Sequence, residues 1–194
     1  MPQPEKYLSV SDYLAAEEQS SVKQEYHNGL LVDMAGGSID HNRIAGNIYF
    51  ELRSRLQDSC TVFNSDQKVY LEVVNHFVYP DVSVVCGELV AQNQAILNPV
   101  LIVEVLSEGT SAYDRGAKFR KYRTLPAFQE YLLIDQDQPI VDALFRESKD
   151  YWRMQTIIGL DREVPVHSLG IRIPMRAIYS GLDSLMEPQI PFDL

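Results

Sequence analysis

Two apolar segments, each with one carboxylate inside it, constrain this chain more than any other feature. Residues 79–85 read Tyr-Pro-Asp-Val-Ser-Val-Val and residues 100–106 read Val-Leu-Ile-Val-Glu-Val-Leu, so the two acids are Asp81 and Glu104. Short runs rich in β-branched residues are typical of buried strands. An ionised carboxylate inside a buried strand is costly unless a cation balances its charge. The pattern therefore predicts two neighbouring strands that share a cation.

The spacing along each strand favours a metal site. Side chains two residues apart lie on one face of a strand, so we expect Glu104 beside Ile102 and Asp81 beside Ser83. If the strands are neighbours in register, both carboxylates reach one divalent ion, and the backbone carbonyl of Val105 is a further ligand. Mg²⁺ suits this site because it takes one or two carboxylates, keeps several waters and binds phosphate oxygens, with Mn²⁺ as the expected substitute. Such an ion generates hydroxide from water and stabilises charge on phosphorus.

A basic segment follows Glu104. Residues 110–125 carry five basic side chains against one acid, a net charge of +4 in a chain whose net charge is -10. The basic residues are Arg115, Lys118, Arg120, Lys121 and Arg123, and the acid is Asp114. The remaining residues carry a net charge of -14, which argues against a broad nucleic-acid-coating surface. A basic element in an acidic body can still focus an anionic ligand, and the alternative is a solvated helix face.

The pattern of the whole chain indicates one α/β domain, residues 1–194, with a mixed sheet. We expect a hairpin around the Asn28-Gly29 turn and a long helix that Asp40 caps, with Ile44 and Ile48 on its buried stripe. The other expected helices begin at Ser11, at the basic segment and at Met175, and the stripe continues through Leu52 and Leu56. The expected strands are 61–63, 68–73, 81–85, 100–106, 131–134, 141–146, 151–156 and 169–173, of which 141–146 and 151–156 form a hairpin.

The cysteines and the apolar runs bear on location. The longest apolar runs are far shorter than the roughly 18 to 20 residues that span a bilayer. The first residues, Met-Pro-Gln-Pro-Glu-Lys, lack the pattern of a secretory signal. We therefore expect a cytoplasmic protein in which Cys60 and Cys86 are buried, reduced thiols, with a disulfide as the alternative.

The residues described so far resemble the PD-(D/E)XK, or restriction-endonuclease-like, nuclease superfamily, because Pro80-Asp81 is followed by Glu104 on the next predicted strand. More closely, the chain resembles a bacterial family of such endonucleases, abundant in cyanobacteria and long described as a domain of unknown function. The likeness spans residues 10 to 180. The matching segments are Glu25-Tyr26…Gly29, His41, Tyr79–Val85, Leu101–Ser107, Asp114-Arg-Gly-Ala-Lys118…Tyr122 and Glu130–Asp135.

The resemblance implies a restriction-endonuclease-like core, a central mixed sheet flanked by helices, with extra hairpins toward each terminus. It also implies a Mg²⁺-dependent DNA endonuclease that acts as a homodimer on duplex DNA, with Asp81 and Glu104 as metal ligands and catalytic residues. In the superfamily pattern a lysine stands two residues after the glutamate, where this chain has Leu106. The likeness therefore assigns the catalytic lysine to Lys118 on the following helix, with Lys121 and Lys68 as reserves.

Simpler interpretations stand beside these assignments. Asp81 could accept backbone N–H groups in a turn, and Lys118 could be a surface lysine paired with Asp114. His41 and Glu25 are accessory candidates, whereas His27, His76 and His167 are expected to be structural or exposed and Trp152 to be part of the core. Two further functions remain open: a catalytically silent nuclease fold that serves as a binding or interaction module, and a metal-dependent hydrolase of a smaller phosphate or sugar compound.

Overall fold

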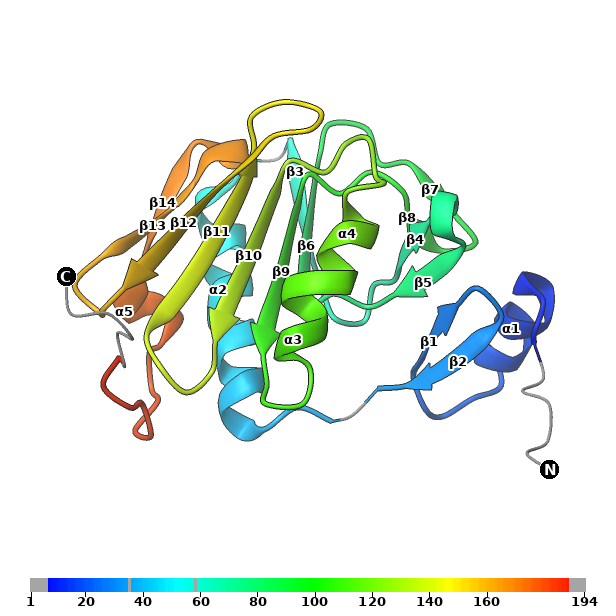
Figure 1. The fold of residues 1–194 in the computed structure, drawn as a ribbon, viewed down its shortest axis with the longest axis horizontal. Coiled ribbons are helices and arrows are strands. Elements are labelled where there is room, and N and C mark those ends of the chain that lie inside the picture. The colour runs from blue at the N-terminus through cyan, green and yellow to red at the C-terminus, as the bar shows by residue number, and fades with distance from the viewer. Residues whose placement is uncertain (1–6, 35, 58, 189–194) are drawn as a thin grey trace.

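A six-stranded mixed sheet forms the centre of the molecule in the computed structural model, which describes residues 7–34, 36–57 and 59–188 (Figure 1). Its strands follow the order β12-β11-β10-β9-β6-β3. Their bounds are Cys60–Asn64 (β3), Val82–Cys86 (β6), Leu101–Leu106 (β9), Glu130–Asp135 (β10), Ile140–Arg146 (β11) and Trp152–Ile158 (β12). Strands β9 and β10 are parallel and the other neighbours are antiparallel. The predicted α/β class with a central mixed sheet is confirmed.

Helices cover both faces of this sheet (Figure 1). One face packs against α2 (Ile39–Arg55), α5 (Met175–Ile178) and a ribbon of β13 (Glu163–Val166) and β14 (Ile171–Pro174), joined by the short helix η3 (His167–Leu169). The other face packs against a continuous helical segment of α3 (Ser111–Tyr113), the π-helical turn η2 (Asp114–Lys118) and α4 (Phe119–Tyr122). The basic segment of the sequence is therefore a helix against the sheet, as predicted.

Helix α2 has the buried stripe that its sequence predicts. Ile44, Ile48 and Leu52 recur every four residues and are fully buried. Leu56, expected as the fourth member, follows the end of the helix and is half-buried. The predicted cap was wrong: the Ser38 hydroxyl, and not Asp40, accepts the backbone N–H of His41 at 3.0 Å. Ser38 precedes the first helical residue and has extended backbone angles, as an N-cap requires.

A second sheet lies beside the first and has the order β2-β1-β5-β4-β8-β7. Its strands are Gln24–His27 (β1), Leu30–Asp33 (β2), Val69–Leu71 (β4), His76–Val78 (β5), Ala91–Gln92 (β7) and Ala95–Ile96 (β8), with the short helix η1 (Glu72–Val74) after β4. The predicted hairpin around Asn28-Gly29 is confirmed, and both turn residues have positive φ, as a tight two-residue turn requires. Helix α1 (Val10–Glu17) packs on this sheet and begins after Ser9 instead of at Ser11.

Several elements differ from their sequence-based bounds. The expected strand 68–73 ends at Leu71, because Glu72–Val74 form a helical turn. Strands β5, β7, β8 and β13 have no counterpart among the predicted strands. The hairpin of β11 and β12 is confirmed, and the β13–β14 ribbon adds a further C-terminal hairpin.

Cys60 and Cys86 form a disulfide, so the prediction of reduced thiols was wrong. The two cysteines are direct partners across the antiparallel pair β3–β6, with Cα atoms 4.0 Å apart. Their separation of 26 residues along the chain disappears once these strands pair. The pairing lies at the opposite end of β6 from Asp81.

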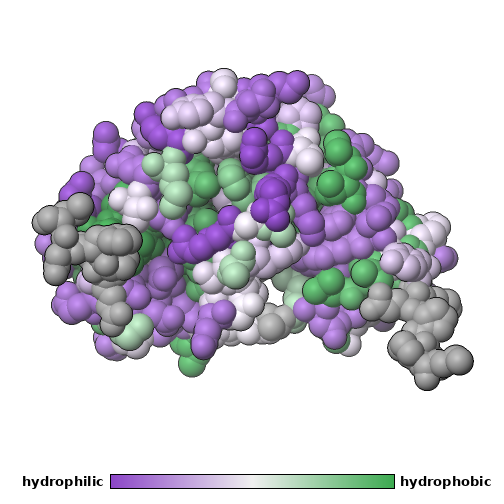
Figure 2. Space-filling view, in the orientation of Figure 1, coloured by the Kyte–Doolittle hydropathy of each residue, from purple (hydrophilic) through white to green (hydrophobic). Residues whose placement is uncertain are grey.

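The face shown in Figure 2 is mainly hydrophilic, with smaller hydrophobic patches between the polar areas. Within the described ranges, the structure has no helix that is both long and apolar enough to cross a membrane. The cytoplasmic location stays a prediction.

Candidate active site

Asp81 lies directly before strand β6, which pairs with the strand β9 that carries Glu104. Strands β6 and β9 are antiparallel with Val82 opposite Val103, and this register continued by one residue sets Asp81 opposite Glu104. The side chains two residues before and after Glu104 on β9 share its face and belong to the core cluster beneath the helical segment. Val103 belongs to the cluster on the other face. The predicted neighbouring strands are confirmed. The shared face of the two carboxylates stays a prediction.

The Asp81 carboxylate has a backbone donor and a histidine beside it. Its Oδ2 accepts the backbone N–H of Val105 at 2.7 Å and lies 3.3 Å from Nε2 of His41. His41 is in the first turn of α2, and a Cβ on Gly37 would lie 2.7 Å from its Nδ1, so the glycine leaves room for the ring. The hydrogen bond to Asp81 is the main cause that raises the pKa of His41, and a hydrogen bond to the Val105 backbone adds to it. A histidine cation is therefore favoured beside Asp81.

The Glu104 carboxylate is almost completely buried, with 4% of the residue exposed. Its Oε1 accepts a hydrogen bond from the hydroxyl of Tyr122 at 2.7 Å and lies 2.7 Å from Nζ of Lys118. Burial raises the pKa of Glu104 to about 8; the charge of Lys118 opposes this rise, and the charges of Asp81 and Asp114 add to it. Strong perturbation of a buried acid by nearby charges is typical of functional sites.

Lys118 lies at the centre of a carboxylate cluster. Besides Glu104, its Nζ is 3.4 Å from Asp114 Oδ1 and 3.9 Å from Glu25 Oε1. Burial alone would lower the pKa of Lys118, but the charges of the three carboxylates outweigh it and raise the pKa above its usual value. Lys118 is 7% exposed, so the interpretation of a surface lysine was wrong.

Glu25 reaches the cluster from strand β1 of the second sheet. Its Oε2 is 2.8 Å from Nε2 of His27, and its Oε1 accepts the backbone N–H of Tyr79 at 3.3 Å. Burial favours a higher pKa for Glu25, but the hydrogen bond to His27, the charge of Lys118 and the Tyr79 N–H together lower it. His27 stacks on His76 with ring centroids 4.5 Å apart. The contact of His27 with the cluster was missed from the sequence, although Glu25 and His27 are two residues apart on a strand and so share a face.

The other lysines considered from the sequence lie elsewhere. Lys121 donates to the Tyr113 hydroxyl at 3.0 Å, and Lys68, directly before β4, pairs with Glu17 at the end of α1. The π-helical turn of Asp114–Lys118 precedes the turn that carries Lys121 and Tyr122, and Tyr122 points to Glu104. Such turns occur mostly as single insertions in helices, often at functional sites.

The donor set fits Mg²⁺. Among the residues that the structure describes, no three Asp, Glu, His or Cys side chains form a ready metal-binding group. Mg²⁺ does not need one, because one or two carboxylates, water and substrate phosphate normally complete its coordination. In the described part of the chain, three carboxylates (Glu104, Glu25 and Asp114) lie around Lys118, while Asp81 beside them pairs with His41 and Glu25 also with His27. The acids of the cluster therefore outnumber its basic side chains. That excess favours a further cation.

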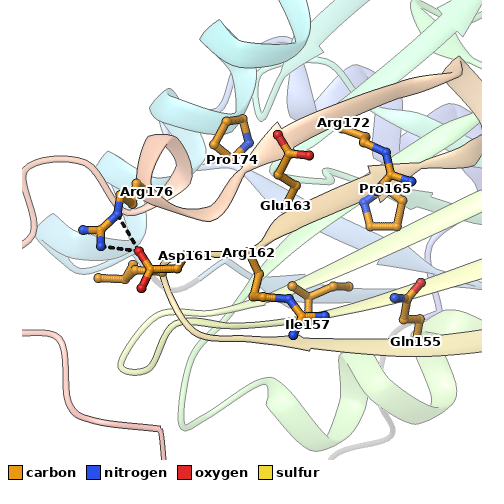
Figure 3. Close-up of a pocket in the computed structure, with 10 residues that line it drawn as sticks. Gln155, Ile157, Asp161, Arg162, Glu163, Pro165, Arg172, Pro174 and Arg176 are labelled. Atoms are coloured by element: carbon orange, nitrogen blue, oxygen red, sulfur yellow. Dashed lines mark hydrogen bonds and ion pairs between the residues drawn. The ribbon is translucent and has the colours of Figure 1, made fainter.

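An open pocket of about 600 Å³ lies away from this cluster, between β12 and the β13–β14 ribbon (Figure 3). Its polar lining includes Arg162 and Arg172 and the pair of Arg176 with Asp161, whose side chains are mostly exposed. It contains none of the clustered carboxylates. The candidate site is therefore the carboxylate cluster and not this pocket.

The chain matches one family model and two proteins of Synechocystis sp. over most of its length. Residues 10–176 match the family model described as "Uma2: Putative restriction endonuclease". The chain is 35% identical over 177 residues to the uncharacterized protein slr1290 of Synechocystis sp., covering 90% of this chain and 93% of that protein. It is 34% identical to the uncharacterized protein sll1609 of the same organism, covering 82% and 92%.

A solved structure shares the fold. It is described as a "putative nuclease belonging to DUF820 from Anabaena variabilis", with a TM-score of 0.67 and 18% identity, covering 86% of this chain and 97% of the other. At this identity the likeness concerns the arrangement of helices and strands.

Proposed function

Because the chain belongs to the Uma2 family and has a nuclease-like fold, we propose that it is a Mg²⁺-dependent DNA endonuclease that hydrolyses phosphodiester bonds. One observation carries the proposal. Asp81 accepts the backbone N–H of Val105, the residue that follows Glu104 on β9, and Lys118 Nζ lies 2.7 Å from Glu104. Two carboxylates and a lysine are the residue types that metal-assisted phosphodiester hydrolysis requires.

Asp81 and Glu104 would hold the metal, with the backbone carbonyl of Val105 as a further ligand. When bound, Mg²⁺ would activate water and stabilise the negative charge that develops on the phosphate. The Val105 N–H already orients the Asp81 carboxylate at 2.7 Å. The tyrosine hydroxyl of Tyr122 does the same for Glu104.

Lys118 would act as a hydrogen-bond donor and a positive charge. Its raised pKa keeps the ammonium protonated at neutral pH, so it does not serve as a general base. A fixed ammonium can orient the attacking water and neutralise negative charge in the transition state. His41, which lies beside Asp81, is the candidate for proton transfer near the same position.

DNA is the proposed substrate, and a homodimer is the proposed assembly. Arg120, Lys121 and Arg123 follow Lys118 on the same helical segment and would meet phosphate groups near the site. Two copies would place one site on each strand of a duplex. Light scattering at several protein concentrations, with and without duplex DNA, would measure the assembly, and a monomer under all conditions would contradict it.

A binding module without catalysis is the second candidate function. It is favoured by the contacts of Glu104, whose Oε1 is shared by Lys118 and Tyr122, and by the net charge of -10. In this case the lysine is the permanent partner of the carboxylate and the fold serves recognition.

Plasmid cleavage with Mg²⁺ distinguishes the two functions. We expect the wild-type protein to nick or linearise the plasmid, and Asp81→Ala, Glu104→Ala and Lys118→Ala to lose this activity. Equal cleavage by all four proteins would indicate a contaminating nuclease. Absence of cleavage by the wild type, together with retained DNA binding in a gel-shift assay, would support the binding module.

A further inference from the structure

Lys118 has more carboxylate partners than its single charge requires. Within the described residues, Glu104, Asp114 and Glu25 all lie within 3.9 Å of its Nζ, at 2.7, 3.4 and 3.9 Å. Burying several acids around one base lowers stability unless a further cation balances their charge. An acid that is kept there is therefore expected to have a purpose. The proposed function gives Glu104 a purpose, which is to bind the metal. It leaves Asp114 and Glu25 without one.

Glu104 has two competing partners under the proposed function. The same carboxylate that would bind the metal now forms the shortest contact of Lys118. A buried ammonium whose nearest carboxylate turns away is destabilised unless another carboxylate balances its charge, so Lys118 would resist the transfer of Glu104 to a metal ion. An alternative carboxylate already within reach removes this resistance.

Glu25 suits this purpose better than Asp114 does. Asp114 is four residues before Lys118 on the same helical segment and moves with it. Glu25 belongs to the other sheet, and groups outside the helical segment fix its position. His27 contacts one carboxylate oxygen and the backbone N–H of Tyr79 donates to the other. Tyr79 is only two residues before Asp81, so Glu25 is fixed to the segment that leads directly into the proposed metal site.

We propose that Glu25 of the N-terminal hairpin is a positioning residue that holds the Lys118 ammonium when Glu104 turns its carboxylate to the metal ion. This inference rests on the proposed function. The second sheet then contributes to the site, although neither of the proposed metal ligands lies on it. Lys118 needs only a small shift, because Glu25 Oε1 is 3.9 Å from its Nζ.

Calorimetric titration of the full chain with Mg²⁺ tests the proposal without a cleavage assay. We expect Glu25→Gln to weaken Mg²⁺ binding about tenfold, the lower range for a residue that supports a metal ligand. In a Lys118→Met background the same substitution should change the affinity less than about twofold, because no ammonium needs a second partner. Such a double-mutant cycle separates the pairwise effect from the general loss of a negative charge.

The controls address folding and electrostatics. Asp142→Asn removes a buried carboxylate that pairs with Arg115 on the same helical segment but does not contact the cluster, so its Mg²⁺ affinity should equal that of the wild type. If Glu25→Gln does not fold, Glu25→Asp keeps the charge but withdraws it from Lys118, and is expected to weaken binding in the wild-type background alone.

The outcomes distinguish a failure of the positioning role of Glu25 from a failure of the metal-dependent function. An equal loss of affinity from Glu25→Gln in both backgrounds, or no loss in the wild-type background, would overturn the positioning role and leave the metal site standing. Absence of Mg²⁺ binding by the wild-type protein would overturn the metal-dependent function, and the positioning role with it.

Discussion

Two lysine–glutamate pairs, one beside each sheet, differ in the groups that surround the glutamate, and this difference decides the direction in which its pKa shifts. Lys118 pairs with Glu104 on the central sheet, and Lys68 pairs with Glu17 beside the second sheet. The two lysines are similarly buried, at 7% and 9% exposed. Lys68 was itself a candidate for the site lysine, so the residue types alone do not distinguish the pairs.

The partners of the two glutamates differ. Glu17 accepts hydrogen bonds from Lys68 and from the hydroxyls of Tyr79 and Tyr13. Burial acts to raise the pKa of Glu17, but these donors outweigh it and lower the pKa. Burial raises the pKa of Glu104 to about 8, Lys118 opposes this rise, and the charges of Asp81 and Asp114 add to it. The first pair is balanced and joins α1 to the start of β4, whereas the second lies among further acids, whose repulsion a metal ion would relieve under the proposed function.

The largest expected difference between the pairs is in activity. Glu104→Gln should lower plasmid cleavage at least about a hundredfold, since it removes a proposed metal ligand and even residues that only support ligands cost ten- to a hundredfold. Glu17→Gln should leave the rate within about twofold. Rates of nicking at saturating Mg²⁺ measure both. Similar losses of cleavage rate in Glu104→Gln and Glu17→Gln would show that the two pairs do not differ in their effect on activity.

The pairs should also differ in their effect on stability. Lys68→Met leaves the half-buried Glu17 without its cation and should lower the free energy of unfolding by about 1 kcal/mol, less than for a fully buried pair because solvent screens the charge. Glu104→Gln should lower it little or raise it at neutral pH, because it removes one acid from an overcrowded cluster. Urea denaturation followed by circular dichroism compares the two, and a larger loss for Glu104→Gln would contradict the comparison.

The pH dependence of stability should have opposite signs in the two pairs. The pKa of Glu104 is raised, so the folded state holds its proton more tightly, and the wild type should lose stability relative to Glu104→Gln as the pH rises from 4.5 to 8. The pKa of Glu17 is lowered, so its contribution is present above pH 4.5 and is lost as the pH falls. Denaturation midpoints between pH 4 and pH 8.5 test both signs, and parallel curves for the two variants would refute the difference.

The smallest expected effects concern the tyrosines. Tyr122→Phe removes one hydrogen bond to Glu104 and should slow cleavage roughly fivefold, which corresponds to about 1 kcal/mol. Tyr13→Phe removes one hydrogen bond to Glu17 and should lower the unfolding free energy by about 1 kcal/mol without changing the cleavage rate. A change in cleavage by Tyr13→Phe would connect the second pair to catalysis.

The sequence predicted the parts of the site that depend on local pattern. Asp81 and Glu104 stand out because a carboxylate interrupts an apolar strand, and the period of two predicts their shared face. The contact of Lys118 with Glu104 came from the family motif, since its place on a helix 14 residues later follows from no strand period. The roles of these residues remain predictions.

The parts that were missed depend on the pairing of distant segments. Glu25 meets Lys118 across 93 residues of chain only because β1 pairs with β5, and β5 itself was not predicted. The disulfide likewise follows from the register of β3 with β6, which no local pattern reveals. Strands of two residues, such as β7 and β8, are too short to show any period.

The cystine of Cys60 and Cys86 has a practical consequence for anyone who assays this protein. Reductants such as dithiothreitol are routine in nuclease buffers, and here they would cut a cross-link at the far end of the strand that begins beside Asp81. Loss of a cross-link that closes a loop of this size typically lowers stability by about 2 to 4 kcal/mol. Preparations made with and without thiols should therefore be treated as two different samples, and a weak activity in one buffer should be checked in the other.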